Sequence, residues 1–133
     1  MPCIFFCNWE DAKKGYHPAY INQPDIDKLI EAIAKAANIS LSEPQLHFVE
    51  GRYWVWTYNS GCVRDQHGVH VFVEWHKGRG IVCKTKIAEA IHKFLTSQGL
   101  GKGSDITFRD SPAGTFFYEG KLVPYAVDIK EFV

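Results

Sequence analysis

The sequence lacks an excess of charge of either sign, because 15 Lys and Arg residues are balanced by 15 Asp and Glu residues. Neutrality argues against a protein that binds nucleic acid or membrane surfaces mainly by electrostatic attraction. No apolar run approaches the ~20 residues that span a membrane. The apolar stretch at residues 1–7 is too short for a signal peptide and is followed at once by polar residues. We therefore expect a cytoplasmic protein with no nucleic-acid and no membrane partner.

Cysteine is also scarce, with four residues and no Cys-x-x-Cys spacing. In the absence of a secretory signal, we interpret Cys3, Cys7, Cys62 and Cys83 as reduced thiols. A zinc site needs three or four ligands in a tetrahedral arrangement, and the histidines do not have a spacing that supplies them. We therefore expect no metal site and no cofactor.

What is present is the composition of an ordinary globular protein, with 133 residues of which 46% are hydrophobic and 23% charged. Such a length favours one domain. Apolar residues recur every three or four positions at 26–37 and 83–95, which predicts two amphipathic helices. Short runs rich in apolar, β-branched and aromatic residues predict four strands, at residues 2–8, 45–50, 69–75 and 105–109.

The order of these elements is strand–helix–strand, twice. Each crossover returns its second strand parallel to the first, and such crossovers are right-handed. We expect an α/β (α+β) fold: two tandem β-α-β units that form a four-stranded sheet with two helices on one face. The first unit covers about 2–58, with an insertion at 9–23, and the second about 69–122, in a single domain of residues 1–133. The other face of the sheet should be buried by oligomerisation.

Two further stretches are rich in aromatic residues. Residues 52–58 predict an additional strand or an edge ribbon, whereas residues 59–68 predict a loop. The tail at 115–125 predicts short extended segments around a turn. Aromatic side chains in either stretch could stack on nucleic-acid bases. Without an excess of basic residues, packing in the core or at a subunit interface is the favoured interpretation.

The run VHVFVEWHKGR at residues 69–79, together with the helix after it, resembles the start of a 4-oxalocrotonate tautomerase unit. In that family a Gly-Arg pair follows the opening strand, and here the pair is Gly78-Arg79. The later run FFYEG at 116–120 adds a resemblance to a family of short bacterial proteins of unassigned function, which is grouped in the tautomerase superfamily and also begins Met-Pro. The similarity is good over 69–122.

This resemblance implies the fold shared by 4-oxalocrotonate tautomerase and macrophage migration inhibitory factor, usually assembled as a trimer. It also implies a catalytic amino-terminal proline, exposed by removal of the initiator methionine, and Pro2 stands at that position. A prolyl amine with a free lone pair can move a proton next to a carbonyl group. Arg79 matches the family's arginine, which binds the acid group of the substrate. Arg109, Trp75 and Tyr118 are further substrate-binding candidates.

We therefore hypothesise a keto-enol tautomerase or isomerase that acts on a small enolisable carbonyl acid as a homotrimer. Pro2 is the general base and Arg79 holds the carboxylate. The alternative is a non-catalytic oligomeric ligand-binding or scaffold protein of the same fold, because no residue matches the lysine or second arginine that relatives place in the pocket. A third hypothesis is a dehalogenase-like enzyme that adds water and uses an acidic partner such as Glu50 or Glu119.

Overall fold

The computed structural model describes residues 2–9, 21–49, 54–59, 61–64, 68–75, 79–110, 117–118 and 120–122. The first strand–helix–strand unit consists of β1 (Cys3–Cys7), α2 (Gln23–Ala37) and β2 (Gln45–Val49). The second consists of β5 (His70–Trp75), α3 (Ile81–Ser97) and β6 (Asp105–Asp110). Two hairpins complete the chain, formed by β3 (Trp54–Thr57) with β4 (Gly61–Arg64) and by β7 (Phe117–Tyr118) with β8 (Lys121–Leu122).

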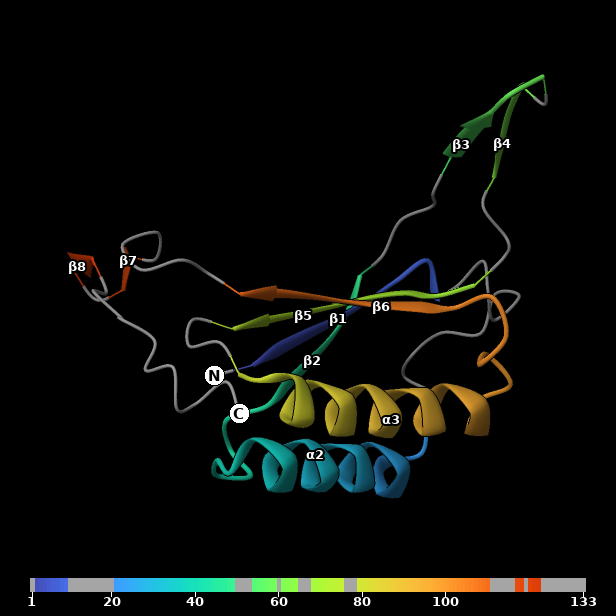
Figure 1. The fold of residues 1–133 in the computed structure, drawn as a ribbon. Coiled ribbons are helices and arrows are strands. Elements are labelled where there is room, and N and C mark those ends of the chain that lie inside the picture. The colour runs from blue at the N-terminus through green and yellow to red at the C-terminus, as the bar shows by residue number, and fades with distance from the viewer. Residues whose placement is uncertain are drawn as a thin grey trace.

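The main sheet has four strands in the order β2-β1-β5-β6. Strands β1 and β2 are parallel, as are β5 and β6, whereas β1 and β5 run antiparallel at the centre. Both helices lie side by side on one face of the sheet (Figure 1). The predicted α+β architecture, with two β-α-β crossovers and one helical layer, is therefore confirmed.

The first helix begins and ends where its sequence favours it. Pro24 occupies the first turn, where its missing N–H costs no hydrogen bond, and Asp25 suits the positive end of the helix dipole. Asn38 ends the helix in a left-handed conformation, with φ of 55°. The apolar stripe buries Leu29 and Ile33 against the sheet layer.

The core lies between the helices and the inner face of the sheet. Alternate residues of the two central strands are fully buried there, namely Ile4, Phe6, Val71 and Val73. Helix α3 contributes Ile87 and Ile91, which are likewise inaccessible. Burying one such side chain contributes about 1.5–3 kcal/mol.

The opposite face of the sheet has no covering layer among the described residues. Phe5 and Phe72 alternate with the core residues and therefore point to this open face. Phe5 stacks on His47 of the neighbouring strand, with ring centroids 4.8 Å apart. The open face combines apolar side chains with a few charged ones, including Glu74 and Arg109.

One prediction was wrong: residues 61–64 are not a loop but strand β4, which pairs antiparallel with β3. The turn between them carries Asn59 at φ 60° and Gly61 at φ 69°, and both residue types tolerate this left-handed backbone. The hairpin is separate from the main sheet. Trp54 and Trp56 are 63% and 76% exposed, so the core interpretation does not hold for them.

Other predicted segments fall partly beyond the described residues. Most of the insertion at 9–23 lies outside the described residues, and so do residues 115–116 and 123–125 of the tail. The β7–β8 hairpin agrees with the predicted extended segments around a turn. In the part of the chain that the structure describes, neither helix has the length and apolarity needed to cross a membrane.

Candidate active site

Pro2 is buried at the start of the central strand β1. Its carbonyl oxygen accepts a hydrogen bond from the Gln45 amide at 3.1 Å, which ties it to the start of β2. The β1–β5 register places Cys3 opposite Glu74. Continued by one residue, this register sets Pro2 opposite Trp75, on the face that the helices cover. The chain therefore begins at the edge of the sheet where the second unit's strands end.

Trp75 is 2% exposed and anchors a group of polar side chains at this edge. Its indole Nε1–H donates to Oδ1 of Asp110, the residue that faces it on β6. Lys84, in the first turns of α3, donates from Nζ to Oδ2 of the same carboxylate at 2.7 Å. Asp110 thus links the ends of β5 and β6 to α3, the helix that connects them. Each of its carboxylate oxygens has a partner.

Arg79 lies against the same tryptophan, with its guanidinium carbon 5.7 Å from the centre of the indole ring. It directly precedes Gly80, the N-cap of α3, which makes no side-chain capping hydrogen bond. The first turn of α3 contains no acidic residue. Arg79, Lys84 and the positive end of the helix dipole bring positive charge to this edge, and Asp110 is the acidic partner of Lys84.

Arg109 lies on the open face, because it precedes Asp110 in β6 and successive strand residues point to opposite faces. Its Nη1 donates to Glu74 Oε1 at 3.1 Å, and its guanidinium carbon lies 4.0 Å from the centre of the Phe72 ring. A shallow hollow of about 360 Å³ adjoins the pair. Within one chain the structure therefore separates Arg109 from Trp75 and Arg79.

The remaining predicted residues lie at the limit of what is described. Tyr118 is in β7, opposite Lys121, but its side chain is outside the described part of the structure. Glu50 and Glu119, the acidic partners required by the dehalogenase hypothesis, also lie outside it. The roles of these three residues remain predictions.

The sequence analysis missed Lys84 and Asp110. A signal for them existed: the carboxyl ends of parallel strands meet at one edge, near the start of the connecting helix, and ligands often bind there. Lys84 is moreover a cation near a helix N-terminus, where the dipole disfavours it unless an anion is close. Asp110 supplies that anion.

Two thiols adjoin this edge without forming a nucleophilic site. Burial raises the pKa of Cys83, although Arg79, Lys86 and Lys84 oppose the shift. Its Sγ donates to the carbonyl oxygen of Ala36 at 3.3 Å. Burial likewise raises the pKa of Cys3. A thiolate is the reactive form of cysteine, so both groups are suited to packing.

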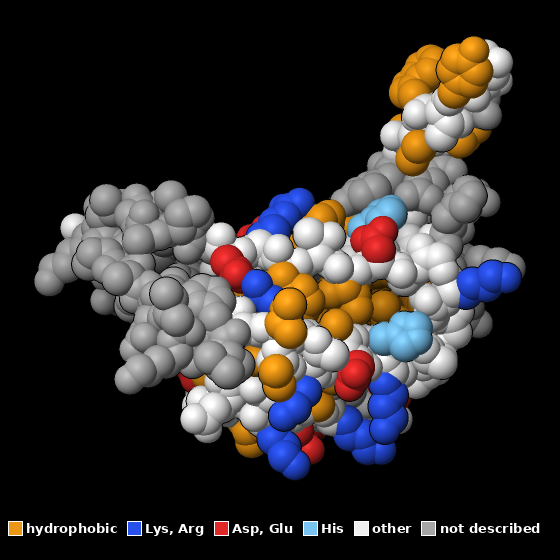
Figure 2. All heavy atoms as spheres, in the orientation of Figure 1, with side chains coloured by type: hydrophobic (Ala, Val, Ile, Leu, Met, Phe, Trp, Pro, Cys, Tyr) orange, Lys and Arg blue, Asp and Glu red, His pale blue; other side chains and the backbone are white. Residues whose placement is uncertain are grey.

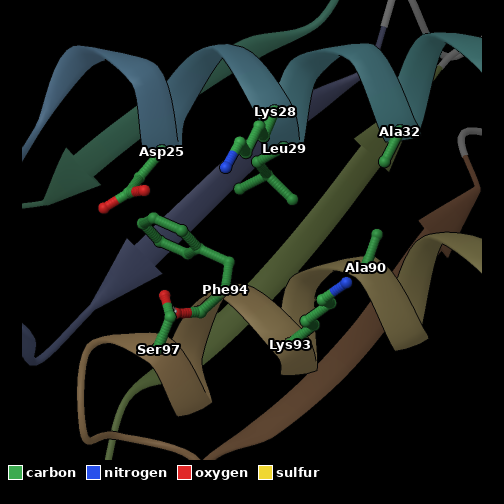
Figure 3. Close-up of a pocket in the computed structure, with 8 residues that line it drawn as sticks. All are labelled: Asp25, Lys28, Leu29, Ala32, Ala90, Lys93, Phe94 and Ser97. Atoms are coloured by element: carbon green, nitrogen blue, oxygen red, sulfur yellow. Dashed lines mark hydrogen bonds between the residues drawn. The ribbon is translucent and has the colours of Figure 1, made fainter.

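A second hollow, of about 300 Å³, lies between α2 and α3. Leu29 and Phe94 point into the gap, and Ala32 and Ala90 face one another across it (Figure 3). The small alanine side chains leave this space open. None of the predicted site residues lines it.

Two of the histidines in the described ranges contact other side chains. His70 Nδ1 lies 2.9 Å from Asp105 Oδ2, and His47 stacks on Phe5. Among the side chains that the structure describes, no group of three His, Cys, Asp or Glu residues could hold a metal ion.

Comparison with solved structures identifies the fold. A domain of unknown function (DUF1904) from Sebaldella termitidis ATCC 33386 superposes with a TM-score of 0.67, at 16% identity over 91% of this chain and 98% of that chain. A fused 4-OT symmetric trimer gives 0.61, at 18% identity over 92% and 94%. Pt0534 inactivated by 2-oxo-3-pentynoate gives 0.57, at 15% identity over 92% and 94%. No family model and no curated protein matches the sequence.

The chain therefore has the fold of the tautomerase superfamily, as the sequence resemblance predicted. Similarity at these identities establishes the fold, so the function is argued from the site itself.

Proposed function

We propose that the protein is a tautomerase-like enzyme that uses the amine of Pro2, exposed after removal of Met1, as a general base on an enolisable carbonyl acid. The observation that carries the proposal is the position of Pro2. The residue is buried, and the β1–β5 register sets it at the edge that holds Trp75, Arg79 and Lys84. A base and an anion-binding group at one edge are what such a substrate requires.

In the proposed reaction, the uncharged amine of Pro2 removes a proton from the carbon next to the substrate carbonyl. The proton then returns from the ammonium to a different atom, which exchanges the keto and enol forms. Burial and neighbouring cations both favour the uncharged form of an amine, and Arg79 and Lys84 supply the positive charge. The same cations hold the substrate carboxylate and stabilise the negative charge that develops on the enolate oxygen.

Trp75 would form the wall of the site and Asp110 would position it. The indole is held through its Nε1–H, which fixes the orientation of the ring. The Asp110 carboxylate also keeps Lys84 at this edge of the sheet. A substrate carboxylate would have to compete with Asp110 for the Lys84 ammonium. Arg79 is therefore the principal carboxylate-binding residue in this proposal.

The test is the enol-to-keto conversion of phenylpyruvate by the wild type and by Pro2→Ala. General-base catalysis contributes about 10²–10⁴-fold, so the variant should lose at least about 100-fold in kcat/KM. Mass spectrometry of the purified protein must show that Met1 is absent, because an acylated nitrogen is not a base. Equal rates for the two proteins, or native protein that retains Met1, would contradict the proposal.

The second candidate is a non-catalytic oligomeric binding protein of the same fold. It is supported by the open sheet face and by Asp110, which already neutralises part of the positive charge. In this case enol acids would bind without turnover, and Pro2→Ala would bind them as tightly as the wild type does.

Either candidate is proposed as a homotrimer, because a fused 4-OT with this fold forms a trimer and because the open face needs a cover. We place the protein in the cytoplasm, where its four free cysteines would remain reduced.

A further inference from the structure

The β3–β4 hairpin forms an arm that projects from the body of the protein. It leaves the sheet after β2 and stands on the side away from the two helices (Figure 1). Trp54 and Trp56 alternate along β3 and therefore share one face of the ribbon, both largely exposed. Tyr58 at the turn is 93% exposed and Val63 on β4 is 47% exposed. Hydrophobic side chains dominate the tip of the arm (Figure 2).

A two-stranded ribbon with this composition is not stable by itself. An isolated hairpin is at best marginally stable in water, and it normally needs packing against another element. The arm forms a sheet of its own and shares no ladder with the main sheet. Exposed aromatic side chains gathered on one projecting element mark a binding surface.

The position of the arm indicates which molecule it can contact. The arm follows β2, whose last residue, Val49, lines the hollow on the open face together with Phe5 and Phe72. Any molecule that covers the open face comes to lie beside the arm, on the side of the sheet away from the helices (Figure 1). The open face and the arm therefore lie on the same side of the sheet.

Area and charge favour a second copy of the chain as that molecule. Each aromatic side chain buries about 150–250 Å², so Trp54, Trp56 and Tyr58 could bury about 450–750 Å². A stable interface takes about 800 Å² per partner, so the arm could supply more than half of that area and the open face the rest. The zero net charge favours self-association over binding to anionic lipids or nucleic acids.

We propose that the β3–β4 arm is a clasp: it grips the second copy of the chain that seats on the open face, with Trp54 and Trp56 as the main anchors. This proposal goes beyond the proposed homotrimer, because it assigns much of the free energy of association between subunits to a ribbon outside the main sheet. It does not depend on catalysis.

The test compares the wild type with the double variant Trp54→Ser/Trp56→Ser by analytical ultracentrifugation over a dilution series. Anchoring aromatic residues each contribute a factor of ten or more, so the dissociation constant should rise at least about 100-fold. The matched control is Leu41→Ser, since Leu41 is 62% exposed in the turn before β2 and should leave assembly unchanged. Circular dichroism checks that each variant is folded.

A second measurement needs no variant: acrylamide quenching of tryptophan fluorescence should weaken as the wild-type concentration rises through the dissociation constant. An arm variant that assembles like the wild type would overturn the clasp while leaving the homotrimer standing. A monomeric wild type overturns both, and neither result bears on turnover by Pro2. Binding of the monomer through these tryptophans to phosphatidylcholine/phosphatidylglycerol vesicles, or to oligo(dT), would also contradict the clasp.

Discussion

The two edges of the main sheet at which the strands begin and end have the same backbone arrangement but different side chains. The Gln45 amide donates to the carbonyl of Pro2 at 3.1 Å, and the Asp105 amide donates to the carbonyl of Val69 at the same distance. Pro2 and Val69 thus occupy equivalent places at the starts of the two units. Because β1 and β5 are antiparallel, they lie at opposite edges of the sheet.

The edge near Val69 is closed by aromatic packing. Trp9, which follows β1, is 1% exposed, and its ring lies 5.0 Å from Phe48 and 6.1 Å from Phe94. Asn8 donates from Nδ2 to the carbonyl of Gly68 at 2.9 Å, which ties the end of β1 to the start of the second unit. This edge contributes stability through buried aromatic packing.

The edge near Pro2 carries charge instead. Its aromatic residue, Trp75, hydrogen-bonds a carboxylate, and two cations lie nearby. Val69 nitrogen is part of a peptide bond, whereas Pro2 nitrogen becomes an amine once Met1 is removed. The same scaffold therefore uses one edge for core packing and carries charged groups at the other.

The largest effect should come from breaking the closed edge. Trp9→Ala removes a fully buried indole and should lower the free energy of unfolding by about 3–5 kcal/mol, as measured by urea denaturation. Trp54→Ala is the matched control on the exposed arm and should change it by no more than about 0.5 kcal/mol in the monomer. A loss below about 1 kcal/mol for Trp9→Ala would contradict the closed-edge assignment.

A smaller loss should follow from Asp110→Ala, which removes the acceptor of both Trp75 and Lys84. Hydrogen bonds to charged groups contribute about 1.5–3 kcal/mol, so the same urea experiment should show a loss in that range. Asp105→Ala on the same strand breaks a more exposed pair with His70 and should cost at most about 1 kcal/mol. Equal losses for the two variants would show that Asp110 does not brace the edge.

Next in size is the effect of Arg79→Leu on substrate binding. Losing a charge-assisted contact to a carboxylate should raise KM for phenylpyruvate about tenfold, with a smaller change in kcat. Arg109→Leu is the control, because Arg109 lies on the open face and should leave KM within about twofold in a single-chain site. If Arg109→Leu raised KM as much as Arg79→Leu, the separation of the two faces would not hold in the assembled protein.

The smallest effect concerns pH and Cys83. Burial raises the pKa of this thiol above its ordinary value of 9.0, so the folded chain binds the proton more tightly than the unfolded chain does. Its contribution to stability is therefore complete below the unfolded value and is lost as pH rises through the folded value. Unfolding free energies at about pH 8 and pH 10 should differ less for Cys83→Ala than for the wild type. An identical pH dependence would contradict the assigned shift.

Much of the fold was predictable because its signals are local. The stripes of α2 and α3 and the alternation of β5 specify which side chains the core takes, and the crossovers follow from element order. Strand β4 was missed because its residues, Gly61–Arg64, carry little strand signal and are ordered by pairing with β3.

The site was predictable in part. The resemblance indicated Pro2 and Arg79, with Trp75 as a further candidate. Arg79 lies against Trp75, and the β1–β5 register continues to Pro2 opposite Trp75, whereas the roles of the three residues stay predictions. Asp110 could not be identified from the sequence, because its link to Trp75 and Lys84 arises from the pairing of β5 with β6 and from the packing of α3. Sequence spacing alone does not give the face of a strand residue, nor the partner of Lys84.

The central claim, that a free Pro2 amine works at the charged edge, is tested most directly by labelling with 2-oxo-3-pentynoate, the compound that inactivated Pt0534. An unprotonated amine adds to such an electron-poor alkyne, whereas a protonated one does not. Peptide mass spectrometry should locate one adduct on Pro2 nitrogen at neutral pH, formed more slowly in Arg79→Leu. Protein that stays unlabelled at Pro2, or is labelled only at cysteine, would contradict the account.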